Sequence, residues 1–197
     1  MTKQDLLKHI ADTAYNVGYG AKKHFATYDM TAKIPGMIGF VSLGFGVFGL
    51  VFDVLTAKAL AATFIVLGVM GICITQYDHK KEKYSDVGIK LTDLFNKLKT
   101  LYFNVKGTGK SDLHEFESEL EAIQKEFNIT GITDQMLFSG WLAHYKFFWE
   151  QQIDWVDEQK KFTLFRDKLP LSFTASAVFV LVVAALVVIH WFCKPCA

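Results

Sequence analysis

The chain has 197 residues, the length of a single domain, and 51% of them are hydrophobic. Its 21 Lys and Arg residues nearly balance its 20 Asp and Glu residues, so the net charge is +1, no basic face is obvious, and we expect no nucleic-acid partner. The hydrophobic residues occur in long blocks, a pattern typical of a membrane protein rather than of a soluble one.

Residues 1–33 are predicted to form an amphipathic cytoplasmic helix, in which Gly18 and Gly20 suggest a bend. Its apolar residues recur at helical spacing: Leu6, Leu7, Ile10, Ala14, Val17 and Ala21. The helix could lie on the membrane surface with snorkelling lysines, or it could pack on later helices. Interspersed acidic residues favour packing. Because this polar segment precedes the first long apolar run, we expect no cleavable signal peptide.

Residues 34–77 are predicted to form a transmembrane hairpin. The apolar run from Ile34 to Leu55 is long enough to cross a bilayer, and the run from Ala59 to Ile74 is near the short end of the range. Backbone groups in lipid must be paired within the segment, so both runs should be helical. The link of three residues between them, 56–58, forces the two helices to be antiparallel.

Small residues follow one stripe on each helix of this hairpin. They are Gly39, Ser42, Gly46, Gly49 and Asp53 on the first, and Ala61, Gly68, Gly71 and Thr75 on the second. Small residues let membrane helices approach closely, so the stripes either close the hairpin or face neighbouring subunits or a pore. In the second interpretation Asp53 lies at the mouth of the pore. The large residues Phe40, Phe45, Phe48 and Phe52 then point to lipid. No ionisable residue lies at mid-depth, so we expect neither a proton relay nor coupled ion transport, and a pore would need several chains.

Residues 78–169 are predicted to form a cytoplasmic helical domain. One apolar face contains Leu91, Leu94, Phe95, Leu98, Leu101, Tyr102 and Val105, and Gly107 to Gly109 end that helix. A second helix is predicted with Ser111 as its N-cap and a heptad seam of Leu113, Phe116, Leu120, Ile123 and Phe127. Gly131 should break it, and Thr133 should cap the next helix.

The last helix of this domain is expected to be long and aromatic. Its stripe contains Trp141, Tyr145, Phe148, Gln152, Trp155, Gln159 and Phe162. Aromatic residues at helical spacing are mostly core residues, so the stripe favours packing over ligand binding. After it, Pro170 fits the first turn of a third transmembrane helix over residues 170–193, whose apolar run from Leu171 to Phe192 contains no Asp, Glu, Lys or Arg.

Residues 194–197 form a short tail, and Cys193 and Cys196 are spaced as a CxxC pair. Such a pair can exchange disulfides, form one disulfide within or between chains in an oxidising exterior, or have no role. Elsewhere the sequence contains no HExxH, GxxxxGK[ST] or GxGxxG motif and no paired metal-ligand spacing. We therefore expect no enzyme, no cofactor and no metal site.

Lysine residues are distributed unevenly about the apolar runs. Most basic residues lie at three ends of the runs: Lys3, Lys8, Lys22, Lys23, Lys33, Lys80, Lys81, Lys83, Lys160, Lys161, Arg166 and Lys168. The hairpin tip has Lys58, and the tail has Lys194. The positive-inside rule then predicts a multi-pass membrane protein whose amino terminus and central domain are cytoplasmic and whose carboxyl terminus is outside.

Three features together resemble a known family. They are the lead-in Ala14-Tyr-Asn-Val-Gly-Tyr-Gly-Ala-Lys-Lys-His-Phe25, the Gly-rich hairpin, and the helical region opening Tyr77-Asp-His-Lys-Lys-Glu82. From Tyr15 to Phe165 this layout resembles the SLATT family, bacterial two-span effectors associated with SMODS nucleotidyltransferases and SLOG sensor domains. The resemblance implies phage defence, in which a nucleotide-signalling or sensor partner triggers an oligomeric effector that breaches the bacterial inner (cytoplasmic) membrane. The third span and the CKPC tail depart from the two-span pattern.

The sequence therefore predicts an all-α membrane protein with a two-helix hairpin, a cytoplasmic helical bundle and a third carboxyl-terminal span. The leading hypothesis is a homo-oligomeric effector whose hairpin lines or gates a pore. Its candidate packing or pore residues are Gly39, Ser42, Gly46, Gly49, Asp53, Gly68 and Gly71. The alternatives are a non-conducting membrane anchor for a partner enzyme and thiol exchange through Cys193 and Cys196.

Overall fold

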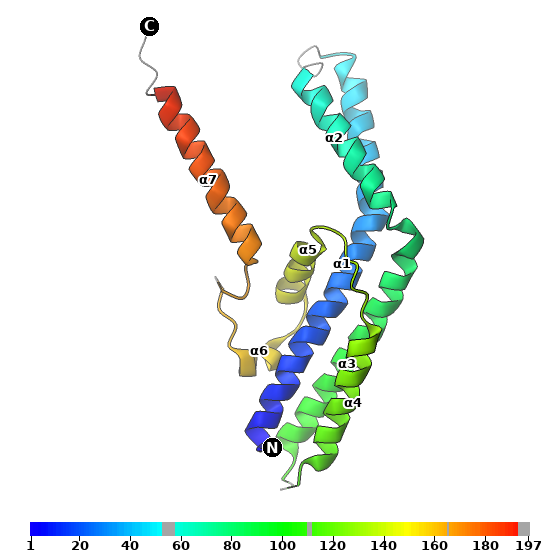
Figure 1. Cartoon of the computed structure of the whole chain (residues 1–197), viewed down its shortest axis with the longest axis vertical. Coiled ribbons are helices and arrows are strands. Elements are labelled where there is room, and N and C mark those ends of the chain that lie inside the picture. The colour runs from blue at the N-terminus through cyan, green and yellow to red at the C-terminus, as the bar shows by residue number, and fades with distance from the viewer. Residues whose placement is uncertain (53–57, 110–111, 165, 193–197) are drawn as a thin grey trace.

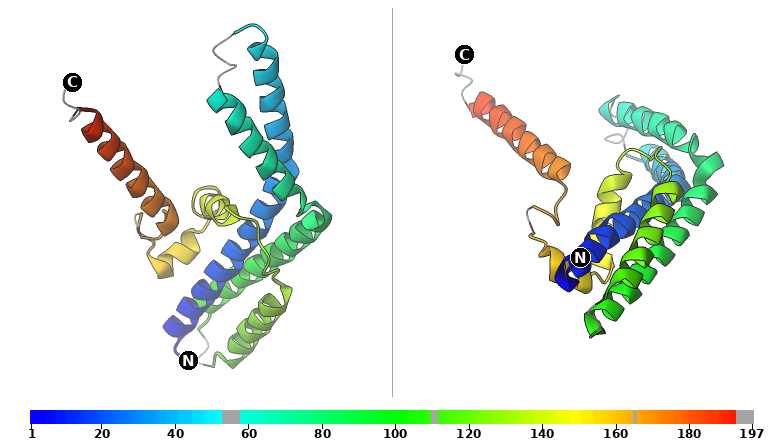
Figure 2. Two further views of the ribbon diagram at one scale, coloured as in Figure 1. Left: turned by 45° about the horizontal axis from the view of Figure 1, so that its top comes forward. Right: turned by 60° about the horizontal axis from the view of Figure 1, so that its bottom comes forward.

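The computed structural model describes residues 1–52, 58–109, 112–164 and 166–192. Within these ranges every regular element is helical, which confirms the all-α fold. Figure 1 shows a bundle formed around the amino-terminal part of the first helix, from which the hairpin and the last helix project at the same end. Figure 2 shows that last helix standing apart from the hairpin in two further views.

The first helix, α1, runs without interruption from Lys3 to Gly49. Thr2 caps it, because its side-chain oxygen accepts a hydrogen bond from the backbone N–H of Asp5 at 3.2 Å. At 1.5 Å per residue, α1 is about 70 Å long. The sequence predicts a boundary between an amphipathic helix and a membrane helix after residue 33. The structure has no break there, because α1 continues through it. Pro35 lies inside α1 and removes one backbone donor, and the helix changes direction between the bundle and the hairpin (Figure 1).

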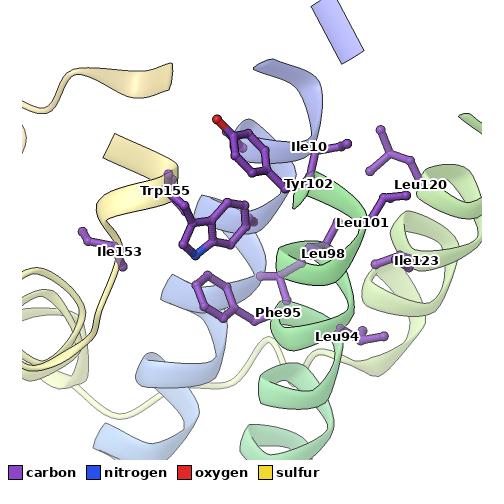
Figure 3. Packing of buried hydrophobic residues seen from close by; sticks show 14 of the residues in the cluster. Ile10, Leu94, Phe95, Leu98, Leu101, Tyr102, Leu120, Ile123, Ile153 and Trp155 are labelled. Carbon is purple, nitrogen blue, oxygen red and sulfur yellow. The ribbon is translucent and has the colours of Figure 1, made fainter. Parts of the chain in front are cut away.

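The amino-terminal part of α1 is the centre of the bundle, as the packing interpretation predicts. Its apolar face is buried against α3 (Lys81–Gly107) and α4 (His114–Thr130) on one side. On the other side it is buried against α5 (Ser139–Tyr145) and α6 (Asp154–Lys160). The buried residues of α1 include Leu6, Leu7, Ile10, Ala11, Ala14, Val17 and Ala21. In Figure 3, Phe95 and Tyr102 of α3 point toward Trp155 of α6, while Leu120 and Ile123 of α4 lie on the opposite side of α3. The predicted apolar faces of α3 and α4 are therefore confirmed.

Gly18 and Gly20 do not bend α1, contrary to the sequence expectation. Gly18 instead allows a close approach between helices, because a Cβ atom there would lie 2.8 Å from ring atoms of both Phe95 and Phe147. Two buried aromatic rings thus occupy the space of the missing side chain. At Gly20 the nearest atom, from Phe127, would be 3.4 Å from such a Cβ atom, which is a tight but ordinary contact.

The hairpin continues from α1 into α2 (Lys58–Thr75), and a 3₁₀ turn, η2 (Asp78–Lys80), leads from α2 to α3. At 18 residues, α2 is about 27 Å long, close to the thickness of a bilayer core. Two helical stretches of the described residues are long and apolar enough to cross a membrane: α1, and the stretch from Leu60 to Gly107 that begins in α2. The most apolar segment of each is almost entirely unburied. A soluble protein would bury such segments in its core.

The start of α4 and the loop that follows α4 differ in part from the sequence expectation. Ser111, the predicted N-cap, lies outside the described residues. α4 begins at His114, whose N–H donates to Asp112 Oδ1 at 3.0 Å. Gly131 follows the end of α4, as predicted. Thr133 caps no helix. The chain instead runs through a loop to α5 (Ser139–Tyr145), and Phe138 precedes α5 with a left-handed φ of 67°.

The predicted long aromatic helix is wrong, because it is broken into three short elements. These are α5, a π-helical turn η3 (Lys146–Glu150), and α6 (Asp154–Lys160). Gln151 takes up an extended conformation, and Lys161 ends α6 with a left-handed φ of 52°. Phe147 of η3 and Trp155 of α6 still both reach the core, from these separate elements.

The last helix, α7 (Leu171–Phe192), has 22 residues, so the predicted helix is confirmed with the predicted bounds of its apolar run. That it crosses a membrane stays a prediction. Its described side chains, up to Leu186, are mostly exposed. The contacts that hold its first turn are the hydrogen bond from Trp141 Nε1 to Ser172 Oγ, at 2.8 Å, and the edge-on packing of Trp141 on Phe173.

The close approach at Gly18 makes a testable prediction. Gly18→Ala should lower the melting temperature of the full chain in detergent, because overpacking a core costs about 1–3 kcal/mol and a gain in helix propensity of about 1 kcal/mol offsets only part of that. Gly20→Ala is the matched control and should leave the melting temperature unchanged or raise it. Circular dichroism would measure both. Equal effects of the two substitutions would contradict the packing argument.

Candidate functional site in the hairpin and at its base

Aromatic and aliphatic side chains close the hairpin. The rings of Phe45 on α1 and Phe64 on α2 pack with their centroids 5.1 Å apart. Lower in the hairpin, Ile38 approaches Gly71, where a Cβ atom would lie 3.7 Å from Ile38 Cδ1. Phe45 is still 39% exposed, and Phe40, Phe48 and Phe52 are exposed as well, so it stays a prediction that these rings point to lipid.

The predicted small-residue stripes are mostly open. At Gly39, Gly46 and Gly68 a Cβ atom would meet no described atom within 4 Å beyond the helix's own nearby backbone, and all three residues are exposed. Gly49 has the same free space but is half-buried, as is Ser42. Gly71 is the one glycine of the predicted set with a described neighbour from the other helix. Within one chain, these glycines contribute little to the contact between α1 and α2. The space beside them remains open in the described structure.

Three of the predicted site residues cannot be placed. Asp53, Cys193 and Cys196 lie outside the described residues. Cys73, which is described, is exposed on α2 with a free thiol. On a different face of α1 from the open stripe, Phe40, Val41, Gly44, Phe45, Phe48 and Phe52 line an open apolar groove.

A cluster of charges lies where the bundle meets the hairpin, and the sequence reading did not find it. Asp29 of α1 forms ion pairs with Lys146 of η3 and, at 2.8 Å, with Lys33 one turn further along α1. Burial alone raises the pKa of Asp29, but the hydrogen bonds and charges of Lys146 and Lys33 lower it by more, so the pKa lies below its ordinary value. Asp29 therefore stays ionised and ties η3 to the last turns before Pro35.

His24 fastens the loop between α4 and α5 to α1. Its Nδ1 lies 2.7 Å from the carbonyl oxygen of Gly20, and its Nε2 lies 3.0 Å from the backbone nitrogen of Ile132. Because the N–H of Ile132 can only donate, Nε2 is the acceptor, and Nδ1 carries the proton and donates to Gly20. The ring is 5% exposed, and this burial lowers the pKa of His24. The folded structure therefore holds His24 in its neutral form.

The same loop has three further polar contacts with the bundle. Thr27 donates to Gln135 Oε1 at 2.8 Å, Lys80 pairs with Asp134 at 3.3 Å, and the hydroxyl of Tyr84 donates to the carbonyl of Asp134. These contacts join α1, η2 and α3 at the base of the hairpin. Sequence reasoning missed them because their partners are about 50 to 110 residues apart, and no local pattern marks such pairs.

The described residues contain no group of three or more His, Cys, Asp or Glu side chains placed to hold a metal ion. The arrangement has two parts. The hairpin has an exposed surface of small residues, and the polar contacts of Asp29, His24 and the loop between α4 and α5 hold the base of the hairpin to the bundle. Such an arrangement can transmit a change in the bundle to the membrane helices.

The chain matches a model of a known protein family. A family model described as SMODS and SLOG-associating 2TM effector domain 6 matches residues 1–177. The chain belongs to this family. The match confirms the SLATT resemblance and extends it to nearly the whole chain. It identifies the chain as a two-transmembrane effector domain and thus as a membrane protein. No curated protein and no solved structure gives a significant match.

The neutral state of His24 predicts a pH dependence. Because the folded pKa lies below the unfolded value of about 6.5, the unfolded state binds the proton more readily, so stability is full above that value and is lost as the pH falls below it. Denaturant unfolding of the full chain in detergent between pH 8 and pH 5 should show this loss. Burial lowers the pKa of His144 as well, so His24→Asn should remove only part of the slope. An unchanged slope in that variant would contradict the assignment.

The charge cluster predicts unequal roles for the two lysines that pair with Asp29. The side chain of Lys146 is 21% exposed and that of Lys33 is 68% exposed. Lys33→Met should have little effect on stability, as for exposed pairs within a helix. Lys146→Met should cost about 1–3 kcal/mol, because Asp29 is then left partly buried without its main partner. The free energies of unfolding in detergent would test this, and equal losses would contradict it.

Proposed function

We propose that this protein is a membrane effector of a bacterial anti-phage system, without enzymatic activity. Several copies associate through their hairpins and breach the inner membrane when a nucleotide-signalling or sensor partner triggers them. Membership of an effector family with two membrane spans supports the general kind of function. The observation that carries the finer proposal is the open stripe on α1, where Gly39 and Gly46 are exposed and have no described neighbour within 4 Å.

The physical argument starts from how membrane helices associate. Lipid tails are as apolar as the helices, so helices associate through close packing, and small residues permit that packing. The two helices of this hairpin already contact each other through Phe45 and Phe64. Gly39 and Gly46 therefore remain available for a helix of a second copy. Repeating this contact around a closed ring would build a pore from several hairpins.

The orientation follows from the lysine distribution together with the shape of the chain. The hairpin and α7 project from the same end of the bundle (Figure 1), so all the basic segments that flank the apolar runs at that end lie on one side. By the positive-inside rule we propose that this side is the cytoplasm and that the bundle receives the trigger there. The carboxyl terminus is then outside.

The role of the stripe can be tested by membrane potential. Wild type, Gly46→Leu and Gly44→Leu would be induced in bacteria, with the neighbouring genes and phage present, and a voltage-sensitive dye would report depolarisation. Gly44 is the matched control: it is on the same helix and also has no described neighbour within 4 Å, but it lies in the phenylalanine groove rather than on the stripe. We expect wild type and Gly44→Leu to depolarise the cells, and Gly46→Leu to leave the potential at the level of uninduced cells.

Equal amounts of the three proteins in the membrane fraction would show that insertion is intact. Depolarisation by Gly46→Leu would sink the stripe hypothesis, and loss of activity in both variants would assign the effect to bulk on α1 in general. No depolarisation by wild type, with a partner retained in pull-downs, would favour the non-conducting anchor. Loss of all activity in a Cys193→Ser, Cys196→Ser variant would favour thiol exchange.

A further inference from the structure

An apolar patch lies outside the hairpin, at the junction of three elements. It consists of Leu137 and Phe138 from the loop before α5, Trp141 from α5, and Phe173 from α7, and we call it the junction patch. Leu137 is 74% exposed, Phe138 46% and Phe173 48%. Trp141 lies between the two phenylalanines, edge-on to both, with ring centroids 5.2 Å from Phe138 and 5.9 Å from Phe173. The three rings form one continuous surface across segments that are far apart in the sequence.

The loop that presents this patch is held firmly from its other side. Ile132, Asp134 and Gln135 bond to His24, Lys80, Tyr84 and Thr27. Met136 of the same loop is buried, whereas the next two apolar side chains, Leu137 and Phe138, are left outside. Loops in soluble proteins usually expose polar residues. Phe138 also has the left-handed φ that a non-glycine residue adopts rarely, so the exposed ring is kept despite an unfavourable backbone conformation.

The position of the patch coincides with the start of the membrane helices. The Trp141 indole donates its hydrogen bond to Ser172, the second residue of α7, so Trp141 lies beside the first turn of that apolar helix. In both views of Figure 2, α5 lies between the base of α7 and the base of the hairpin. Tryptophan is enriched at this depth in membrane proteins, because its ring is apolar while its N–H needs a polar partner.

We propose that the junction patch is an interfacial membrane contact, which inserts into the boundary between the lipid headgroups and acyl chains of the bilayer that holds the hairpin and α7. The inference rests on the part of the proposed function that places those helices in a bilayer, and not on pore formation. Continuity with α7 favours lipid over a protein partner.

The contact would fix the bundle relative to the membrane at a point separate from the hairpin. α5 packs on α1 in the bundle, and Trp141 joins α5 to α7. With the patch anchored in lipid, a displacement of α1 against α5 becomes a displacement of the hairpin relative to the membrane surface. A bundle held only by the hairpin would instead tilt as one body.

A fluorescent label would test the depth of the patch in the full chain. Cys73, Cys193 and Cys196 would be replaced by serine, and Leu137→Cys labelled with an environment-sensitive nitrobenzoxadiazole dye. The protein would be reconstituted in phosphatidylcholine vesicles with or without lipid spin-labelled near the top of the acyl chain. Phe103→Cys is the matched control, since Phe103 is 49% exposed near the far end of α3. Ile65→Cys on α2, with 69% exposure of the native side chain, reports the hairpin itself.

We expect the label at Leu137 to emit at shorter wavelength than the label at Phe103 and to be quenched several-fold more by the shallow spin label. An emission as polar and unquenched as at Phe103 would overturn the proposal. A blue-shifted but unquenched label would overturn it too, because protein rather than lipid would then cover the patch. Quenching at Ile65 distinguishes a failure of the proposed function from a failure of this inference. If the label at Ile65 is not quenched, the membrane hairpin and the proposed function are refuted. If the label at Ile65 is quenched and the label at Leu137 is not, only the junction patch is refuted.

Discussion

The whole structure depends on one continuous helix that is buried at one end and exposed at the other. The amino-terminal part of α1 contributes the central apolar face of the bundle, and the same helix continues past Pro35 into the hairpin. A helix transmits rotation and translation along its axis, because each backbone hydrogen bond couples adjacent turns. The bundle and the membrane hairpin are therefore connected by one continuous helix, which runs from the buried core to the stripe of Gly39 and Gly46.

The junction between these two parts is polar, whereas the parts themselves are apolar. Near the last bundle turns of α1, Asp29 binds two lysines and His24 binds the loop backbone. Partly buried charges are costly unless they are paired, so these contacts tolerate few alternative arrangements. They define the direction in which the hairpin leaves the bundle. The apolar contacts of the core alone would fix that direction less well, because hydrophobic packing is not directional.

The sequence predicted the parts of this fold that depend on local pattern. The apolar faces of α1, α3 and α4, the hairpin and the bounds of α7 all follow from periodicity or from run length. The predicted aromatic helix failed because the backbone becomes extended at Gln151, and the segment has no Gly or Pro there to mark the break. Gly18 was misread because its role is to admit Phe95 and Phe147, which are distant in the sequence. In the charge cluster at Asp29, the pair with Lys33 is local, but Lys146 lies over 100 positions away, so no local pattern marks the cluster as a whole.

Among the described residues, the last helix, α7, is attached to the bundle and not to the hairpin. The family match ends at residue 177, so most of α7 lies beyond the two-span pattern. Its described link to the rest of the chain is through Trp141 of α5, and it stands apart from the hairpin in every view. A helix that packed on α1 there would cover part of the hairpin surface. Because the described contacts of α7 are with the bundle instead, α7 leaves the stripe on α1 uncovered.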